Sequence, residues 1–359
     1  MDSRSYAPQE RAFRVTASRC LGQVLDLDLF QYCACGCLTC PHEGRRGAPS
    51  RQSTFEAYGR TRQAFDGPGS LGMNSSLPAQ VEAWLRETSP RSRPAFVSVG
   101  LAAEPLPGFA DSTAMLGRAL AALLEAGVGI SLRTRRNLPD SILDIFRQHP
   151  ELVRITIPLP LLDNLALSRW EPGTASASQR LFTIQRLRAA RLAVQVAVKP
   201  LIPFVNDDEA HLAPLVSAIS DLGIKKIAAS FLRLTPAVKR RLESASAPVS
   251  ARLIFGAYLE RRPEGDAVLR MPPLERRRAT YERLDGIARD RGARLALCHC
   301  ADPDLGEDSC LLWPEDIQRG QATRTVGAAS SESESGRQQD GASSRRTPAQ
   351  VGFTDLLRR

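Results

Sequence analysis

The chain has 359 residues, of which 43% are hydrophobic and 24% are charged, a balance that excludes a wholly disordered or fibrous protein. It contains no uncharged apolar run of about 18 residues and no apolar signal core near its N-terminus, so we expect a cytoplasmic protein without a membrane partner. The net charge of +9 permits an anionic partner such as nucleic acid, and it fits a solvated basic surface equally well.

Apolar runs alternate with longer amphipathic stretches through most of the chain. The apolar runs predict strands at Gln23–Leu29, Ala95–Gly100, Gly129–Thr134, Val153–Leu159, Ala193–Leu201, Lys226–Leu232 and Arg294–Cys298. The amphipathic stretches predict helices at Ser112–Ala126, Pro139–Arg147, Ala177–Ala190, Glu209–Leu222 and Pro273–Arg291. Apolar strands separated by helices indicate βαβ units around a parallel sheet. We therefore predict an α/β fold, a partial (β/α)6-type TIM-like barrel, in preference to a doubly wound sheet, because no Gly-rich phosphate loop follows the first strand.

Changes in composition divide the chain into three regions. We expect residues 1–22 to be an N-terminal extension, residues 23–316 to form the barrel domain, and residues 317–359 to be a disordered tail rich in Ser, Gly, Gln and Arg. Within the barrel domain, Arg45–Ser92 is long and irregular. This segment and Leu234–Pro273 are candidate lids over one end of the barrel.

Seven of the eight cysteines fall into two clusters, one near each end of the barrel domain. The first cluster follows the first predicted strand and reads Cys33-Ala34-Cys35-Gly36-Cys37-Leu38-Thr39-Cys40. In a cytosolic chain, clustered cysteines bind metal or perform redox chemistry more often than they form disulfides.

Three interpretations of the first cluster remain open from the residues alone. A zinc site would need a second Cys pair, which Cys298 and Cys300 could provide. A redox dithiol at Cys37 and Cys40 leaves the other two cysteines unexplained. Alternatively, three thiolates on one loop can hold a [4Fe–4S] cluster and leave one iron open for a ligand.

The Cys-x3-Cys-x2-Cys spacing of Cys33, Cys37 and Cys40, after the first strand of a βα-alternating chain, resembles the radical S-adenosylmethionine (SAM) superfamily. The resemblance implies that these three cysteines bind a [4Fe–4S] cluster, that Cys35 does not, and that SAM chelates the open iron. It also implies reductive cleavage of SAM to methionine and a 5′-deoxyadenosyl radical, which removes a hydrogen atom from a substrate. The electron would come from a reductase or a flavodoxin-type donor.

A narrower resemblance covers roughly two-fifths of the chain, from about residue 97 to residue 234, and is to radical SAM proteins related to spore photoproduct lyase. The matching pieces are Ile155-Thr156-Ile157-Pro158-Leu159, Leu162-Asp163, Trp170-Glu171-Pro172-Gly173-Thr174 with Arg180-Leu181, and Lys199-Pro200-Leu201-Ile202-Pro203-Phe204-Val205-Asn206-Asp207. Members of this group act on diverse substrates, so the resemblance does not identify the substrate.

Five residues outside the cysteines are candidates for binding SAM. Glu104, after the second predicted strand, takes the place of the acidic turn residue that accepts hydrogen bonds from the SAM ammonium in the superfamily. Because residues at the C-terminal ends of parallel strands surround the site of a barrel, we expect Arg180 to bind the SAM carboxylate and Glu171 to orient Arg180. Ser131 and Thr134 are expected to reach the ribose hydroxyls.

The second cysteine cluster comprises Cys298, His299 and Cys300, with Cys310 ten residues after Cys300. The three cysteines could form a second metal site, zinc or iron–sulfur. Alternatively, Cys298 or Cys300 donates a hydrogen atom to a substrate radical, because the last strand of a barrel lies beside the first. Inert buried thiols are the third interpretation.

The sequence leaves the substrate unidentified, and an anionic or nucleotide-like compound, nucleic acid included, is one candidate. The arginines that could contact such a substrate lie in the second candidate lid and are Arg240, Arg241, Arg252, Arg261 and Arg262. A solvated basic face is the favoured interpretation of these arginines. The alternative function is a zinc-stabilised nucleic-acid-binding module without catalysis, in which both cysteine clusters are structural.

Overall fold

The structure, a computed structural model, describes residues 12–18, 21–30, 33, 35–40, 73–245, 248–264 and 267–306. The predicted tail at 317–359, Cys310 and most of the Arg45–Ser92 segment lie outside the described residues.

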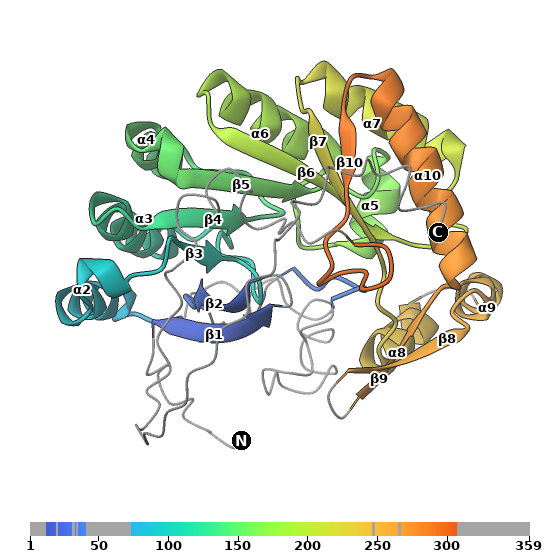
Figure 1. The fold of residues 1–359 in the computed structure, drawn as a ribbon, viewed down its shortest axis with the longest axis horizontal. Coiled ribbons are helices and arrows are strands. Elements are labelled where there is room, and N and C mark those ends of the chain that lie inside the picture. Colours follow the sequence, from blue (N-terminus) through green and yellow to red (C-terminus); the bar gives the residue numbers. More distant parts are fainter. Residues whose placement is uncertain are drawn as a thin grey trace, which may run out of the picture.

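An eight-stranded, mostly parallel sheet curves through the described part of the chain as a partial barrel (Figure 1). The strands are β1 (Phe13–Ser18), β2 (Gly22–Leu27), β3 (Phe96–Val99), β4 (Gly129–Arg133), β5 (Val153–Pro158), β6 (Ala193–Leu201), β7 (Lys226–Phe231) and β10 (Arg294–Ala296). Their order in the sheet is β1-β2-β3-β4-β5-β6-β7-β10, and the β1–β2 pair alone is antiparallel within it. The predicted fold class is confirmed, and the seven predicted strands are β2 to β7 and β10.

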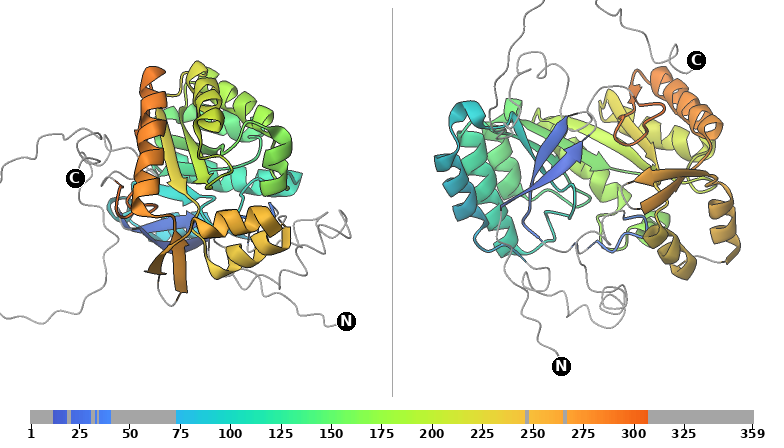
Figure 2. Two further views of the ribbon diagram at one scale, coloured as in Figure 1. Left: turned by 90° about the vertical axis from the view of Figure 1, so that its right-hand side faces the viewer. Right: turned by 60° about the horizontal axis from the view of Figure 1, so that its bottom comes forward.

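Helices form a layer along the outside of the sheet, and their axes run beside the strands in both views of Figure 2. They are α2 (Leu77–Glu87), α3 (Ala110–Glu125), α4 (Asp140–Gln148), α5 (Asn164–Trp170), α6 (Ala177–Ala189), α7 (Glu209–Asp221) and α10 (Leu274–Asp290), with short 3-10 turns at Pro90–Ser92 and Pro150–Leu152. The five predicted helices correspond to α3, α4, α6, α7 and α10, with ends that differ by at most two residues, as helix boundaries commonly do.

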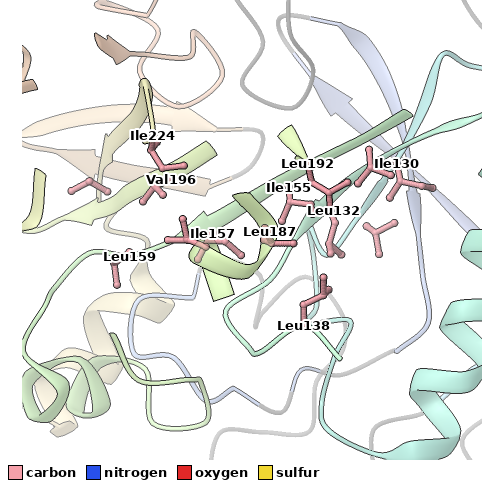
Figure 3. Packing of buried hydrophobic residues seen from close by; sticks show 14 of the residues in the cluster. Ile130, Leu132, Leu138, Ile155, Ile157, Leu159, Leu187, Leu192, Val196 and Ile224 are labelled. Atoms are coloured by element: carbon pink, nitrogen blue, oxygen red, sulfur yellow. The ribbon is translucent and has the colours of Figure 1, made fainter. Parts of the chain in front are cut away.

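Side chains along each strand point alternately to the two faces of the sheet, one packed against the helices and the other lining the concave side. Ile130 and Leu132 of β4 lie in one buried cluster with Ile155 of β5 and Leu187 of α6 (Figure 3). Because side chains along a strand alternate between faces, Ser131 points to the opposite, concave face of the sheet. The helix-facing side is therefore apolar, and the concave side can carry polar groups.

Two segments differ from the sequence-based expectation. Phe13–Ser18, expected to lie in an N-terminal extension, is the edge strand β1 of the main sheet, and the Phe13 ring packs on Trp84 with centroids 4.8 Å apart. The prediction that Arg45–Ser92 is irregular is wrong for Leu77–Glu87, which forms α2. Pro78 in the first turn and the buried pair Leu77 and Val81 are a helix signal that the flanking Gly/Ser-rich sequence obscures.

The second candidate lid, Leu234–Pro273, folds as a small unit beside the barrel (Figure 1). It contains α8 (Pro236–Ala245), α9 (Pro248–Gly256) and the antiparallel hairpin β8 (Glu260–Glu264) and β9 (Ala267–Met271). A second hydrophobic cluster joins this unit to the first cysteine cluster, since Leu38 packs in it with Val238, Leu242 and Tyr258.

The backbone after β3 requires glycine at position 100. Gly100 has φ +89°, and a Cβ there would lie 2.2 Å from the carbonyl oxygen of Arg133 at the end of β4. Because a left-handed backbone and a clash with main chain both oppose a side chain, we expect Gly100→Ala to lower the free energy of unfolding by about 3 kcal/mol. Urea unfolding of the metal-free protein measures the loss.

Gly127→Ala is the matched control for this prediction. Gly127 also has a positive φ, +74°, but a Cβ there meets nothing within 4 Å. Gly127→Ala should lower the free energy of unfolding by about 1–2 kcal/mol, which is the cost of the left-handed backbone alone. Equal losses for the two variants would contradict the proposed contact between the β3 and β4 ends.

Candidate functional site

A cavity of about 330 Å³ lies inside the curved sheet, and both cysteine clusters line it. The described cysteines in its wall are Cys33, Cys35, Cys37, Cys40, Cys298 and Cys300. The loop from Gly100 to Glu104 after β3 forms another part of the wall, as do residues at the ends of β4, β6 and β7. The fold thus brings together residues that are more than 250 positions apart in the sequence.

The first cysteine cluster is held in place by the segment that follows α5. The Leu38 backbone N–H donates to the Trp170 carbonyl over 2.9 Å, and the Gly173 N–H donates to the Cys35 carbonyl over 2.9 Å. From the other side, the Arg241 guanidinium of α8 donates to the carbonyl of Cys40. The Trp-Glu-Pro-Gly stretch therefore supports the cysteine loop.

Hydrogen bonds within this loop shift the pKa values of Cys33 and Cys35 in opposite directions. A hydrogen bond from the Cys35 thiol is the main cause that lowers the pKa of Cys33 to about 6, against the opposing effect of burial. The backbone N–H of Glu104 also donates to Cys33 Sγ over 3.4 Å. Hydrogen bonding to Cys33 and Cys37 raises the pKa of Cys35 well above its ordinary value. The hydrogen bond from Cys35 thus favours the thiolate form of Cys33, the form of cysteine that binds metal.

The donor set of the loop fits a thiolate-bound cluster. Cys33, Cys37 and Cys40, the three predicted ligands, all line the one cavity, and Cys35 lies between the first two as a hydrogen-bond donor. Among the described residues, no three Cys, His, Asp or Glu side chains converge on the position of a single metal ion. Three thiolates on one loop can each bind a separate iron of an iron–sulfur cluster.

Glu104 is buried in the cavity wall and is held from three directions. Its carboxylate accepts hydrogen bonds from the Thr134 hydroxyl at 2.5 Å, the Arg135 N–H at 2.8 Å and the Leu106 N–H at 3.3 Å. Burial raises the pKa of Glu104, although these hydrogen bonds oppose the rise. The carboxylate is thus fixed in orientation next to Cys33.

The two hydroxyls expected at the ribose do not line this cavity. Thr134 is 1% exposed, and its hydroxyl donates to Glu104 and accepts from the Arg136 N–H at 3.0 Å. Ser131 is buried on the concave face of β4. In this arrangement Thr134 orients the glutamate.

Arg180 and Glu171 form a fully buried pair behind the cavity. Arg180 Nη2 lies 2.5 Å from Glu171 Oε2, and both side chains are at most 1% exposed. Nη2 also donates to the Thr174 hydroxyl, and Nε and Nη1 donate to the carbonyls of Ala175 and Pro158. Neither Arg180 nor Glu171 lines the cavity.

Glu171 reaches the cavity wall through a second arginine. Its other carboxylate oxygen, Oε1, accepts from Arg135 Nε at 3.2 Å, and Arg135 is in the lining. The Arg180 guanidinium is therefore bound by protein groups instead of by a SAM carboxylate. Of the two arginines that Glu171 binds, Arg135 is the one that lines the cavity.

The second cysteine cluster lies on a tight turn after β10 that reaches the end of β1 (Figure 1). The Ser18 hydroxyl and Cys300 Sγ are 3.4 Å apart, and the N–H of Asp302 donates to the Cys298 carbonyl over 3.0 Å. Gly306 packs so closely that a Cβ there would lie 2.4 Å from the His299 nitrogen. Cys298 and Cys300 thus lie in the same cavity wall as the first cysteine cluster, although β10 pairs with β7 and not with the first strand. Cys310 lies outside the described residues.

A buried arginine of α10 fixes this turn. Arg277, whose side chain is 0% exposed, binds Asp302 through Nη1 and Asp304 through Nη2 at 2.6 Å. Tyr281 of the same helix donates to Asp302 over 3.2 Å and accepts from the Phe231 N–H at 3.3 Å. Buried charges are stable only when they are paired, so this network holds the turn against β7.

Sequence reasoning missed the cationic side chains of the cavity. Those in its lining are Arg133, Arg135, Lys199 and Arg233. Their positions at or just after strand ends were the available signal. The arginines that we expected to contact an anionic substrate, Arg240, Arg241, Arg252, Arg261 and Arg262, are all absent from the lining.

Comparisons with known sequences give partial matches. No protein-family model matches the chain. It is 30% identical over 146 residues to uncharacterized proteins of Mycobacterium tuberculosis and Mycobacterium bovis, a match that covers 39% of this chain and 40% of each relative. The chain therefore spans about two-fifths of the length of the curated relatives it matches.

None of the helices within the described ranges has the length and apolarity needed to cross a membrane.

Comparisons with solved structures identify the class of fold. The described residues have the partial-barrel fold of the spore photoproduct lyase class. Within this class, a variant of spore photoproduct lyase matches with a TM-score of 0.60 at 14% identity, covering 81% of each chain. A form of that enzyme with bound AdoMet and dinucleoside spore photoproduct matches with a TM-score of 0.55 at 15% identity, covering 79% of this chain and 78% of the other. At these identities the likeness concerns the fold.

Proposed function

We propose that this chain is a radical SAM enzyme that binds a [4Fe–4S] cluster through Cys33, Cys37 and Cys40 and cleaves SAM reductively. The observation that supports this most strongly is the set of three cysteines with Cys-x3-Cys-x2-Cys spacing in the wall of one barrel cavity, beside the buried carboxylate of Glu104. A reduced cluster of this kind supplies one electron to bound SAM, giving methionine and a 5′-deoxyadenosyl radical that removes a hydrogen atom from a substrate.

The residues around the cysteines would bind and orient SAM. Glu104 has a carboxylate already aimed by Thr134 and the Arg135 N–H, so it can accept from the SAM ammonium without reorganisation. Of the arginines in the lining, Arg135 is the one paired with Glu171, and its guanidinium can bind the SAM carboxylate. Arg180 is then a positioning residue that acts on Arg135 through Glu171.

The wall of the cavity also suits radical chemistry because part of it is apolar. Val24, Leu101, Phe231 and Leu232 contribute to the lining. A carbon radical reacts with whatever it meets, so an enzyme that forms one must exclude water and other reactive groups. The small unit at Leu234–Pro273 remains the described candidate for a lid.

Cys298 or Cys300 is proposed as the hydrogen-atom donor that quenches the substrate radical. Its S–H bond breaks, a C–H bond forms on the substrate carbon, and a thiyl radical is left on the sulfur. One electron and one proton from the external reductase or flavodoxin-type donor then restore the thiol. Both thiols already lie in the cavity lining.

Metal analysis separates this role from a second metal site. As hydrogen donors, Cys298 and Cys300 bind no iron, so the Cys298→Ala/Cys300→Ala protein should contain the same iron, sulfide and zinc per chain as the wild type. A loss of roughly half the iron, or of a full equivalent of zinc, would show that the second cluster ligates metal instead.

The assay for the function as a whole is chromatography of the products formed from SAM. Anaerobically purified protein, reduced with dithionite in the presence of SAM, should release 5′-deoxyadenosine and methionine. The alternative, a zinc-stabilised module for nucleic acid, predicts a colourless protein that forms neither product. A brown protein that binds SAM but yields no 5′-deoxyadenosine would mean that the scaffold has lost the chemistry.

A further inference from the structure

A buried arginine lies against the first cysteine loop. Arg241 of α8 is 4% exposed, and its Nη2 donates a hydrogen bond to the carbonyl of Cys40. Burial lowers the pKa of Arg241, and the negative charges of Cys40 and then of Cys37 oppose that fall. Arg241 was expected to contact an anionic substrate, but its contact is with the loop that carries the proposed cluster ligands.

Apolar packing fixes α8, and with it Arg241, against the same loop. Val238 and Leu242 of α8 are both 0% exposed, and they lie in one hydrophobic cluster with Leu38, which stands inside the cysteine loop. Because side chains in a packed interior have little freedom to move, the guanidinium keeps a constant place beside the loop.

Two further charged groups flank the loop from the β3 and β4 ends of the sheet. The Arg135 guanidinium binds the Glu171 carboxylate at 3.2 Å, and the Arg135 N–H donates to the Glu104 carboxylate at 2.8 Å. The Glu104 N–H in turn donates to Cys33 Sγ. None of these contacts involves α8, so replacing Arg241 changes the charge beside the loop and leaves the Arg135 and Glu104 contacts in place.

We propose that Arg241 raises the reduction potential of the [4Fe–4S] cluster by holding a fixed positive charge beside two of its cysteine ligands, Cys37 and Cys40. Reduction adds one electron, and therefore one negative charge, to a cluster that three thiolates already make anionic. A nearby cation stabilises the added charge, and it does so more strongly in a buried site than in water. The charge is permanent, because a guanidinium keeps its proton in proteins. The inference deepens the proposed function and rests on it, since it requires the cluster at these cysteines.

The test is a redox titration of the anaerobically purified protein without SAM, followed by electron paramagnetic resonance of the reduced cluster. Arg241→Gln keeps an N–H donor near the Cys40 carbonyl but removes the charge. At a fixed potential we expect the ratio of reduced to oxidised cluster to fall about tenfold, a shift of ~59 mV to more negative potential for a one-electron couple.

Two further variants separate charge from structure. Arg241→Lys keeps the positive charge and should stay near the wild-type potential. Arg240→Gln is the matched control, because it removes the same charge from the neighbouring, exposed position of α8. It too should have the wild-type potential.

Several results would overturn the assignment. Equal potentials in the wild type and in Arg241→Gln would remove the electrostatic role, and an equal shift in Arg240→Gln would assign the effect to the overall charge of the protein. If Arg241→Lys shifted as far as Arg241→Gln, or if Arg241→Gln lost its iron, Arg241 would hold the loop and not tune the cluster. A wild-type protein without iron would refute the proposed function itself, and this inference with it, so the two failures are distinguishable.

Discussion

Replacing Cys33, Cys37 or Cys40 by alanine is expected to abolish both the brown colour and the cleavage of SAM. Each proposed ligand lies in the wall of the same cavity, and a cube held by three thiolates has no protein group in reserve when one is lost. Iron and sulfide per chain should fall from about four of each to near zero, and 5′-deoxyadenosine should fall below detection.

Cys35→Ala is the matched control, since it removes a thiol from the same loop and the same cavity wall. Cys35 lies outside the Cys-x3-Cys-x2-Cys spacing of the three proposed ligands, so Cys35→Ala should retain iron and sulfide. Full loss of iron in Cys35→Ala, with retention in any of the other three, would assign the ligands differently.

The second large effect is expected from Arg180→Met, which should lower the free energy of unfolding by about 3–5 kcal/mol. The substitution removes the closer partner of the Glu171 carboxylate, which is 1% exposed, and leaves Arg135 at 3.2 Å. It also removes the guanidinium donor to the carbonyls of Pro158 and Ala175. Urea unfolding of the metal-free protein measures the change.

Arg186→Met on the same helix provides the comparison. Arg186 pairs with Asp140, whose side chain is 85% exposed, and such pairs contribute at most about 1 kcal/mol. If Arg180→Met were as mild as Arg186→Met while SAM affinity fell, Arg180 would be a direct SAM ligand, as the sequence suggested. A large loss of stability supports its role in holding Glu171 and Arg135.

The fold was predictable from the sequence because hydrophobic pattern and helix stops agree along most of the chain. Strand β6 was predicted with its observed bounds, Ala193–Leu201. A short apolar run between two helical patterns indicates a buried strand. Strand β1 was missed because Phe13–Ser18 is a short edge strand whose Val15 is 58% exposed, so its pattern is weak. The β8–β9 hairpin was missed because β8 consists of four charged residues and a proline, which is not a strand pattern.

The candidate site was predictable where spacing along the chain encodes the chemistry. Three cysteines within eight residues must lie near one another in any fold, and Glu104 stands in the loop five residues after β3 ends at Val99. Arg135 and Lys199 were missed, because whether a polar residue at a strand end faces a cavity depends on register and twist. Arg180 was predicted at the site, but its neighbour Glu171 and two carbonyls bind it in the interior. A sequence does not show which of two nearby arginines is satisfied by protein groups.

Electron paramagnetic resonance of the dithionite-reduced protein, recorded with and without SAM, tests the central claim most directly. If three cysteines hold the cube and one iron is open, the reduced protein should give a signal that changes shape when SAM is added. A signal from a fully cysteine-bound cluster that ignores SAM would contradict the account. So would a colourless protein whose cysteines hold tetrahedral zinc.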